Sequence, residues 1–188
     1  NILNHDVQRI ERLITDYSQM LKDEVALSKE KMKRINLKLI IRSVVDDFNS
    51  IYETKRGIKI ILNDLSNQEE YFINGIENRI EQIIANLLDN SISFSDDNKK
   101  ILVEVSKDDK DKIILRVIDE GKGFKESNTK KIFDRFYSNR PDNFGEHSGL
   151  GLNIVKNLVD LHGATISAAN NTAQKGANVE IIFPKSQT

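Results

Sequence analysis

One short segment of the chain combines an acidic residue with glycines at the end of an apolar run. The run from Ile113 to Ile118 leads directly into Asp119, and Gly121 and Gly123 follow. A strand that ends in a carboxylate places a hydrogen-bond acceptor beside backbone without side chains, which a flat ring can approach closely. This arrangement suits an adenine pocket, although a carboxylate that simply ends a strand in a turn is the structural alternative.

Two asparagines stand out on a predicted helix. Residues 76–94 carry isoleucines and leucines at helical spacing, and Asn86 and Asn90 lie four residues apart on one face of that helix. Two amides beside the core of a domain suggest a ligand-binding face. The alternative is a pair of ordinary helix-surface asparagines.

Glycines also precede a later helix. A polar loop at residues 138–148 leads into Gly149 and Gly151, and a helix is predicted over residues 150–161. Bare backbone N–H groups at a helix start bind anions well, because the helix dipole is positive there. The chain has neither a Gly-x-x-x-x-Gly-Lys-Ser/Thr segment nor a Gly-x-Gly-x-x-Gly segment after a strand, so a nucleotide would be held in another way.

Composition limits the possible classes. The 188 residues are enough for one large domain or a domain with an appendage, and 38% of them are hydrophobic. The formal net charge of −1 gives no general attraction to nucleic acid. The absence of cysteine excludes disulfides and thiolate metal sites. No apolar run reaches membrane-spanning length, so we expect a soluble chain that could be part of something larger.

The order of predicted elements indicates the fold. Residues 2–22 have a coiled-coil-like apolar repeat and are predicted to be a helix that needs a partner helix, and residues 22–34 to continue it into a connector. We place a domain boundary near Ile35 and a helix from Leu37 that ends before Gly57. We also predict a short helix through Phe133, and we expect the helix at 150–161 to end at His162-Gly163. Strands are predicted at 58–62, 71–73, 101–105, 113–118, 164–169 and 177–183.

These elements predict an α/β fold. We expect a two-layer sandwich of a mixed, mostly antiparallel sheet covered by helices on one face, preceded by a long N-terminal helix.

Four segments resemble a known family. Residues 86–90, 119–123, 133–136 and 148–152 are similar, in chain order, to the N, G1, F and G2 boxes of sensor histidine kinases. That family belongs to a wider ATP-binding superfamily with DNA gyrase, mismatch-repair ATPases and a heat-shock chaperone. The resemblance implies an ATP-binding catalytic domain at 36–188, and at 1–35 the second helix of a truncated dimerisation and phosphotransfer hairpin.

The resemblance implies roles for the singled-out residues. Asp119 would accept a hydrogen bond from the adenine amine and reject guanine, whose oxygen at that edge is also an acceptor. Gly121 and Gly123 would let the backbone pass under the base. Asn90 would hold Mg²⁺ through its amide oxygen, with Asn86 on the same face.

The resemblance also implies phosphotransfer. In the ATP-hydrolysing relatives the position of Asn86 is a glutamate that activates water, whereas an amide cannot accept a proton at neutral pH. The phosphates would be bound by a lid that contributes Arg140 and by Gly149, Leu150, Gly151 and Leu152 at the helix start.

The sequence departs from the family pattern at two places. Many members follow the second asparagine with Ala-x-Lys, whereas this chain has Ser91, Ile92 and Ser93 there, so one phosphate contact is unassigned. The segment that begins at His5 matches only the first half of the family's phosphoacceptor motif, and it lacks the proline of that motif. We therefore interpret His5 as a surface residue of the second helix and expect the phosphoacceptor histidine to lie outside this chain.

We therefore predict a catalytic module of a protein-histidine kinase. It would bind ATP and Mg²⁺ and transfer the γ-phosphoryl group to a histidine of the missing helix, for relay to an aspartate of a response regulator. The resemblance implies a homodimeric intact protein that is anchored in the cell membrane, with this chain as a cytoplasmic domain.

Other classes remain open. An anti-sigma-type serine kinase would share the pocket, and an ATPase machine would need the glutamate that Asn86 replaces. A degenerate nucleotide-binding scaffold is a further alternative, because of the missing lysine. A protein that only dimerises through its helix would leave the four ordered segments unexplained.

Overall fold

The structure is a computed structural model, and it describes Ile14, Ser18 and residues 30–67, 70–125, 129–134, 151–171 and 175–186. Most of the predicted N-terminal helix therefore lies outside the described residues. The same holds for His5, for the loop at 138–148 with Arg140, and for Gly149 and Leu150.

A mixed sheet forms one layer of the described part of the chain. Its strands are arranged in the order β2-β4-β5-β7-β6. The pair β2 and β4 is parallel, and the other neighbours are antiparallel. The predicted mixed and mostly antiparallel sheet is thus confirmed. The strands are β2 (Lys59–Asp64), β4 (Lys100–Lys107), β5 (Ile113–Asp119), β6 (Thr165–Asn170) and β7 (Ala177–Phe183).

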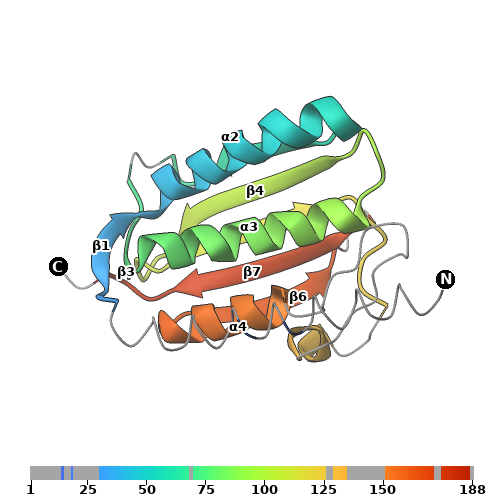
Figure 1. Cartoon of the computed structure of the whole chain (residues 1–188). Helices are drawn as coiled ribbons and strands as arrows, with labels where there is room; N and C mark the ends of the chain where they lie inside the picture. The colour runs from blue at the N-terminus through green and yellow to red at the C-terminus, as the bar shows by residue number, and fades with distance from the viewer. Residues whose placement is uncertain are drawn as a thin grey trace.

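Helices cover one face of this sheet (Figure 1). They are α2 (Leu37–Arg56), α3 (Glu77–Phe94) and α4 (Gly151–Leu161), with α3 between the other two, and a short 3₁₀ helix, η1 (Thr129–Phe133), precedes α4. Alternate residues of β5 and β7 are buried against the helices, which is the period-two pattern of a strand with one covered face. Burial of this apolar face supplies the main driving force for the fold.

The helix ends follow local rules. Asn36 caps α2, since its Oδ1 accepts a hydrogen bond from the Lys38 backbone N–H at 3.2 Å. Gly57 ends α2 with a φ of 65°, and Gly163 follows the end of α4 with a φ of 63°. Both glycines lie where the sequence predicts a left-handed helix stop. Among the described residues, no helix combines the length and the apolar character needed to cross a membrane.

A short strand was not predicted from the sequence. The predicted connector at residues 22–34 ends inside β1 (Lys33–Asn36), which pairs antiparallel with β3 (Phe72–Gly75). The β1 sequence has one apolar residue, Ile35, so it shows no alternation that would indicate a strand. Tertiary pairing with β3 decides its conformation, and the Arg34 guanidinium stacks 3.6 Å from the centre of the Phe72 ring. The domain boundary near Ile35 stays a prediction.

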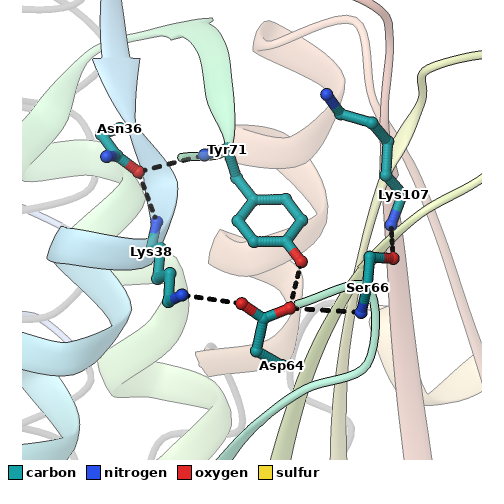
Figure 2. A network of polar contacts seen from close by, with 6 residues as sticks. All are labelled: Asn36, Lys38, Asp64, Ser66, Tyr71 and Lys107. Carbon is teal, nitrogen blue, oxygen red and sulfur yellow. Dashed lines mark hydrogen bonds and ion pairs between the residues drawn. The ribbon is translucent and has the colours of Figure 1, made fainter. Parts of the chain in front are cut away.

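A polar network fixes the start of α2 against the sheet (Figure 2). The Asp64 carboxylate forms an ion pair with Lys38 at 2.7 Å and accepts a hydrogen bond from the hydroxyl of Tyr71, whose side chain is fully buried. Asp64 also accepts a hydrogen bond from the backbone N–H of Ser66. Asn36 and the Lys107 backbone complete the network.

This network lies at the opposite end of the sheet from Asp119. Asp64 is in register with Val105 near the end of β4, whereas Asp119 is in register with Ile101 near the start of β4. The network therefore serves the fold, and the nucleotide-binding chemistry suggested by Asp119 is located elsewhere.

A buried histidine joins α3 to α4. The Ile76 backbone N–H donates to Nε2 of His162 at 3.1 Å, and Nδ1 donates to the Leu158 carbonyl at 2.7 Å. Ile76 precedes α3 and provides no side-chain cap, so the imidazole satisfies a backbone donor at the start of that helix. Burial lowers the pKa of His162 below its ordinary value of 6.5.

We expect a stability loss on acidification that depends on His162. Its folded pKa is lowered, so the unfolded chain binds a proton more readily, and stability falls as the pH drops below about 6.5 towards the folded value. Thermal unfolding across this range should show the loss in the wild-type protein and a smaller loss in His162→Gln, which cannot titrate. Equal pH dependence of the two proteins would contradict this role.

Candidate nucleotide site

Asp119 lies at the last position of β5, in a buried environment. Only 3% of its surface is exposed, and its Oδ1 accepts hydrogen bonds from the backbone N–H groups of Gly121 at 2.9 Å and Ala177 at 3.0 Å. Because both backbone donors converge on Oδ1, lone pairs of Oδ2 are left for a ligand.

Burial determines the electrostatics of this carboxyl group. It raises the pKa of Asp119 above its ordinary value, and this effect outweighs the hydrogen bonds from the backbone N–H groups of Ala177 and Gly121, which favour the ionised form. A buried carboxylate with open lone pairs gains more from a ligand donor than an exposed one, since water does not compete for it.

The glycines around Asp119 leave no room for side chains. A Cβ added at Gly121 would stand 2.5 Å from the Phe94 carbonyl oxygen, and one at Gly176 would stand 1.8 Å from the Asp119 carbonyl oxygen. Gly123 has a φ of 74°, which favours glycine. Backbone segments from β5, α3 and β7 thus meet around one carboxylate.

A side chain of β6 holds the segment that follows Asp119. Asn170 Oδ1 accepts from the Phe124 backbone N–H at 2.6 Å, and its Nδ2 donates to the Phe124 carbonyl at 3.0 Å. This paired bond fixes the backbone next to Gly123. Sequence reasoning missed Asn170, because its partner is 46 residues away and no local pattern indicates it.

The asparagines lie on α3, whose end contacts the end of β5. Asn86 and Asn90 are both half-buried, which is the exposure of residues that can reach a ligand while still on the packed helix. A Cβ added at Gly121 would stand 2.5 Å from the Phe94 carbonyl oxygen, so the end of α3 lies close to the segment that follows β5. The structure therefore brings the helix that carries the amides to the strand that carries the carboxylate.

Arg56 of α2 holds the C-terminal end of α3. Its Nη1 donates to the Ile92 carbonyl at 2.8 Å and its Nη2 to the Ser95 carbonyl at 2.7 Å, while Nε pairs with Asp97 at 2.6 Å. These carbonyls belong to the helix end, where no further turn of helix satisfies them. Arg56 directly precedes Gly57 in the sequence, and no local pattern indicates this contact.

The remaining described site residues open α4. Gly151 and Leu152 form the first turn of α4, and an added Cβ at Gly151 meets no described atom within 4 Å. Phe133 is buried at the end of η1, and its carbonyl accepts a hydrogen bond from Asn153 of α4 at 2.9 Å. Phe133 thus packs in the interior, and its backbone carbonyl connects η1 to α4.

The described residues offer few side-chain donors for a metal ion. Within the described ranges, no group of three or more histidine, cysteine, aspartate or glutamate side chains could hold a metal ion. The chain's own candidate ligand is the neutral amide oxygen of Asn90. Such a site suits a cation that is bound mainly by water and phosphate oxygens.

Comparison with known proteins shows the family of the chain. Residues 75–187 match the family described as "Histidine kinase-, DNA gyrase B-, and HSP90-like ATPase". A carboxylate at a strand end, glycines around it and a helix with two asparagines thus occur in a chain that belongs to this ATPase family.

The similar proteins include a sensor protein, a sensor protein kinase and a histidine kinase. The chain is 32% identical to the Sensor protein ChvG of Agrobacterium fabrum, and the match covers all of this chain and 33% of ChvG. It is 26% identical to the Sensor protein kinase PmrB of Pseudomonas aeruginosa, and that match covers 98% of this chain and 38% of PmrB. A nucleotide-free catalytic domain of the histidine kinase ThkA has a TM-score of 0.72 at 25% identity, and the match covers 84% of this chain and all of that one. The chain spans about a third of the length of the curated relatives it matches.

Proposed function

We propose that this chain is the ATP-binding catalytic module of a sensor histidine kinase. The observation that carries the proposal is the Asp119 carboxylate, buried at the end of β5 with close backbone at Gly121 and Gly176. The family match and the likeness to the ThkA catalytic domain support it. The module would bind MgATP and deliver the γ-phosphoryl group to a histidine outside this chain.

Adenine recognition would rest on Asp119. The exocyclic amine of adenine donates a hydrogen bond to the carboxylate, whereas guanine presents a carbonyl oxygen there that repels it. Gly121 and Gly123 would border the ring with backbone alone. The low exposure of Asp119 makes this discrimination strong, because water cannot replace the lost bond.

Asn90 would hold Mg²⁺, with Asn86 beside it on α3. When bound, this ion neutralises charge on the phosphates during phosphoryl transfer. The amide of Asn90 suits this partner, since it is a hard neutral oxygen ligand and leaves room for water and phosphate oxygens. Asn86 cannot act as a general base at neutral pH, so the chain's own residues favour transfer to a side chain over hydrolysis.

The phosphates would be bound at the start of α4. Gly151 and Leu152 lie in the first turn of this helix, where N–H groups and the helix dipole attract anions. Arg140, Gly149 and Leu150 stay predicted contributors to the same phosphate contacts. Positioning of the phosphates and charge neutralisation would then supply most of the catalysis.

The phosphoryl group would reach a response regulator through a dimeric protein. A ThkA structure in complex with the response regulator TrrA is 25% identical to this chain, with a TM-score of 0.72, and the match covers 99% of this chain and 50% of that one. By analogy, the chain's partners would be the receiver domain of a regulator and the dimerisation helices of its own protein. We propose that residues 1–35 belong to those helices, that residues 36–188 form the catalytic domain, and that the intact protein is anchored in the cell membrane with this domain on the cytoplasmic side.

The proposal is tested first by calorimetric titration of the chain with MgATP and with MgGTP. Binding of ATP with much weaker binding of GTP is the expected result. The longer protein that includes the phosphoacceptor helix should then form acid-labile, base-stable phosphohistidine from γ-labelled ATP. Phosphoserine on an added protein, rapid phosphate release, or binding without any transfer would each overturn the histidine kinase assignment.

The contribution of α4 is tested by Gly151→Ala. An added Cβ has no described atom within 4 Å, and alanine is a better helix former, so folding stability should be unchanged or higher by up to about 1 kcal/mol. MgATP binding should fall about tenfold, because the methyl group stands where the phosphates approach the backbone. Thermal unfolding and calorimetry measure the two effects. Unchanged affinity would remove Gly151 from the phosphate site.

A further inference from the structure

Asn170 forms two hydrogen bonds to a single residue of the segment that follows Asp119. Its Oδ1 accepts from the Phe124 backbone N–H at 2.6 Å, and its Nδ2 donates to the Phe124 carbonyl at 3.0 Å. One planar amide thus satisfies both backbone polar groups of that residue, as a neighbouring strand would. The Phe124 side chain packs against the hydrophobic core, so this residue is held from the core and from β6.

Gly123 precedes this residue and lies against the same amide. A Cβ added at Gly123 would stand 2.7 Å from Asn170 Oδ1 and 3.2 Å from the Gly176 carbonyl oxygen. The backbone therefore passes close to β6 and to the start of β7 at this point. Because Asn170 bonds the very next residue, the position of Gly123 relative to the sheet depends on that amide.

The start of the same segment is held by β7. The Ala177 backbone N–H donates to Asp119 Oδ1, and the Asn171 backbone N–H donates to the Gly176 carbonyl at 2.9 Å, which ties the end of β6 to the start of β7. The two strand ends thus hold the segment at its two ends. The Asn170 contact uses a side chain, so a substitution can remove it without altering the strand ladder.

We propose that Asn170 is a positioning residue for adenine recognition, and that its amide holds residues 121–124 in the place where they border the base. The inference rests on the proposed function, since it assumes that Asp119 accepts a hydrogen bond from adenine there. A segment that is fixed before the ligand arrives binds it without a further loss of conformational entropy. Because the contact lies on the base side of the site, it acts alike on nucleotides with different numbers of phosphates.

Asn170→Ala tests the proposal, with Asn63→Ala as the matched control. Asn170 is exposed at the end of β6, so alanine leaves no cavity. Asn63 is a strand asparagine of β2 whose side chain forms no hydrogen bond with a described residue. In calorimetry, Asn170→Ala should bind MgATP and MgADP about 3- to 10-fold more weakly than the wild type, by the same factor for both, and Asn63→Ala should bind like the wild type. A loss confined to ATP, or no loss, would overturn the positioning role.

Backbone NMR order parameters separate positioning from a general loss of stability. In the nucleotide-free protein, the order parameters of residues 122–124 should be lower in Asn170→Ala than in the wild type or Asn63→Ala, while those of β5 and β7 stay the same. Saturating MgATP should raise them to the wild-type value, because the bound base then orders the segment. Lower order throughout the sheet, with no recovery on binding, would show that Asn170 only stabilises the fold.

The nucleotide-free measurement also keeps the two hypotheses distinguishable. Equal order parameters in the three proteins would overturn the positioning role of Asn170, whatever the nucleotide affinity. Absence of ATP binding by the wild-type chain, with the lower order present in Asn170→Ala, would instead overturn adenine recognition and with it the recognition role of Asn170.

Discussion

Asp119→Asn is expected to weaken ATP binding by about ten- to a hundredfold. A hydrogen bond to a charged group contributes roughly 1.5–3 kcal/mol, and the buried position of Asp119 keeps water from replacing it. The asparagine side chain can still turn its oxygen towards the adenine amine only by presenting its own NH₂ to the backbone donors of Gly121 and Ala177, which is unfavourable. The ligand therefore loses the acceptor that the carboxylate provided.

The same substitution should leave the protein as stable as the wild type or more stable. Burial raises the folded-state pKa of Asp119 above its unfolded value, so the native protein binds a proton more readily than the unfolded chain. Stability from this group is therefore present at low pH and is lost as the pH rises through the folded pKa. Asparagine carries no charge to desolvate, and its oxygen can keep both backbone hydrogen bonds.

Calorimetry and thermal unfolding together measure this prediction. Weak ATP binding with an unchanged or higher unfolding temperature at neutral pH supports a ligand-binding role for Asp119. The variant should discriminate less than the wild type against GTP, because the asparagine NH₂ can donate to the guanine oxygen that repels a carboxylate. If affinity and stability fell together, Asp119 would be a structural residue of the strand end.

Much of the sheet and its covering helices could be predicted because the signals are local. Alternating burial in β5, helical spacing in α3 and glycines after α2 and α4 each depend on residues close in sequence. β1 could not be predicted in this way, because Ile35 alone provides no pattern and the strand exists through pairing with β3. Local preference decides an element only where no distant partner overrides it.

The candidate site likewise contains residues that the sequence indicates and residues that it does not. Asp119 and its glycines, and the two asparagines, stand out by residue type and spacing. The contacts of Arg56 and Asn170 are long-range, and arginine and asparagine are common on any helix or strand. Candidate ligand-binding residues are therefore easier to predict from the sequence than the residues that hold them in place.

The second large effect is predicted for a substitution of Gly176, because Gly176 packs against Asp119. Its φ is 137°, and an added Cβ would stand 1.8 Å from the Asp119 carbonyl oxygen. The next residue, Ala177, donates its backbone N–H to Asp119 Oδ1. In Gly176→Ala, the start of β7 must therefore move away from the end of β5, which strains the backbone and removes a donor from the carboxylate.

We expect Gly176→Ala to lose about 2–4 kcal/mol of folding free energy and to bind ATP more weakly in the fraction that remains folded. Gly163→Ala is the matched control: Gly163 also has a positive φ, of 63°, but no described atom lies within 4 Å of its added Cβ. The control should lose about 1 kcal/mol from backbone strain alone and keep wild-type ATP affinity. Urea unfolding and calorimetry compare the two variants, and equal losses would show that backbone strain, rather than the close contact with Asp119, requires glycine at position 176.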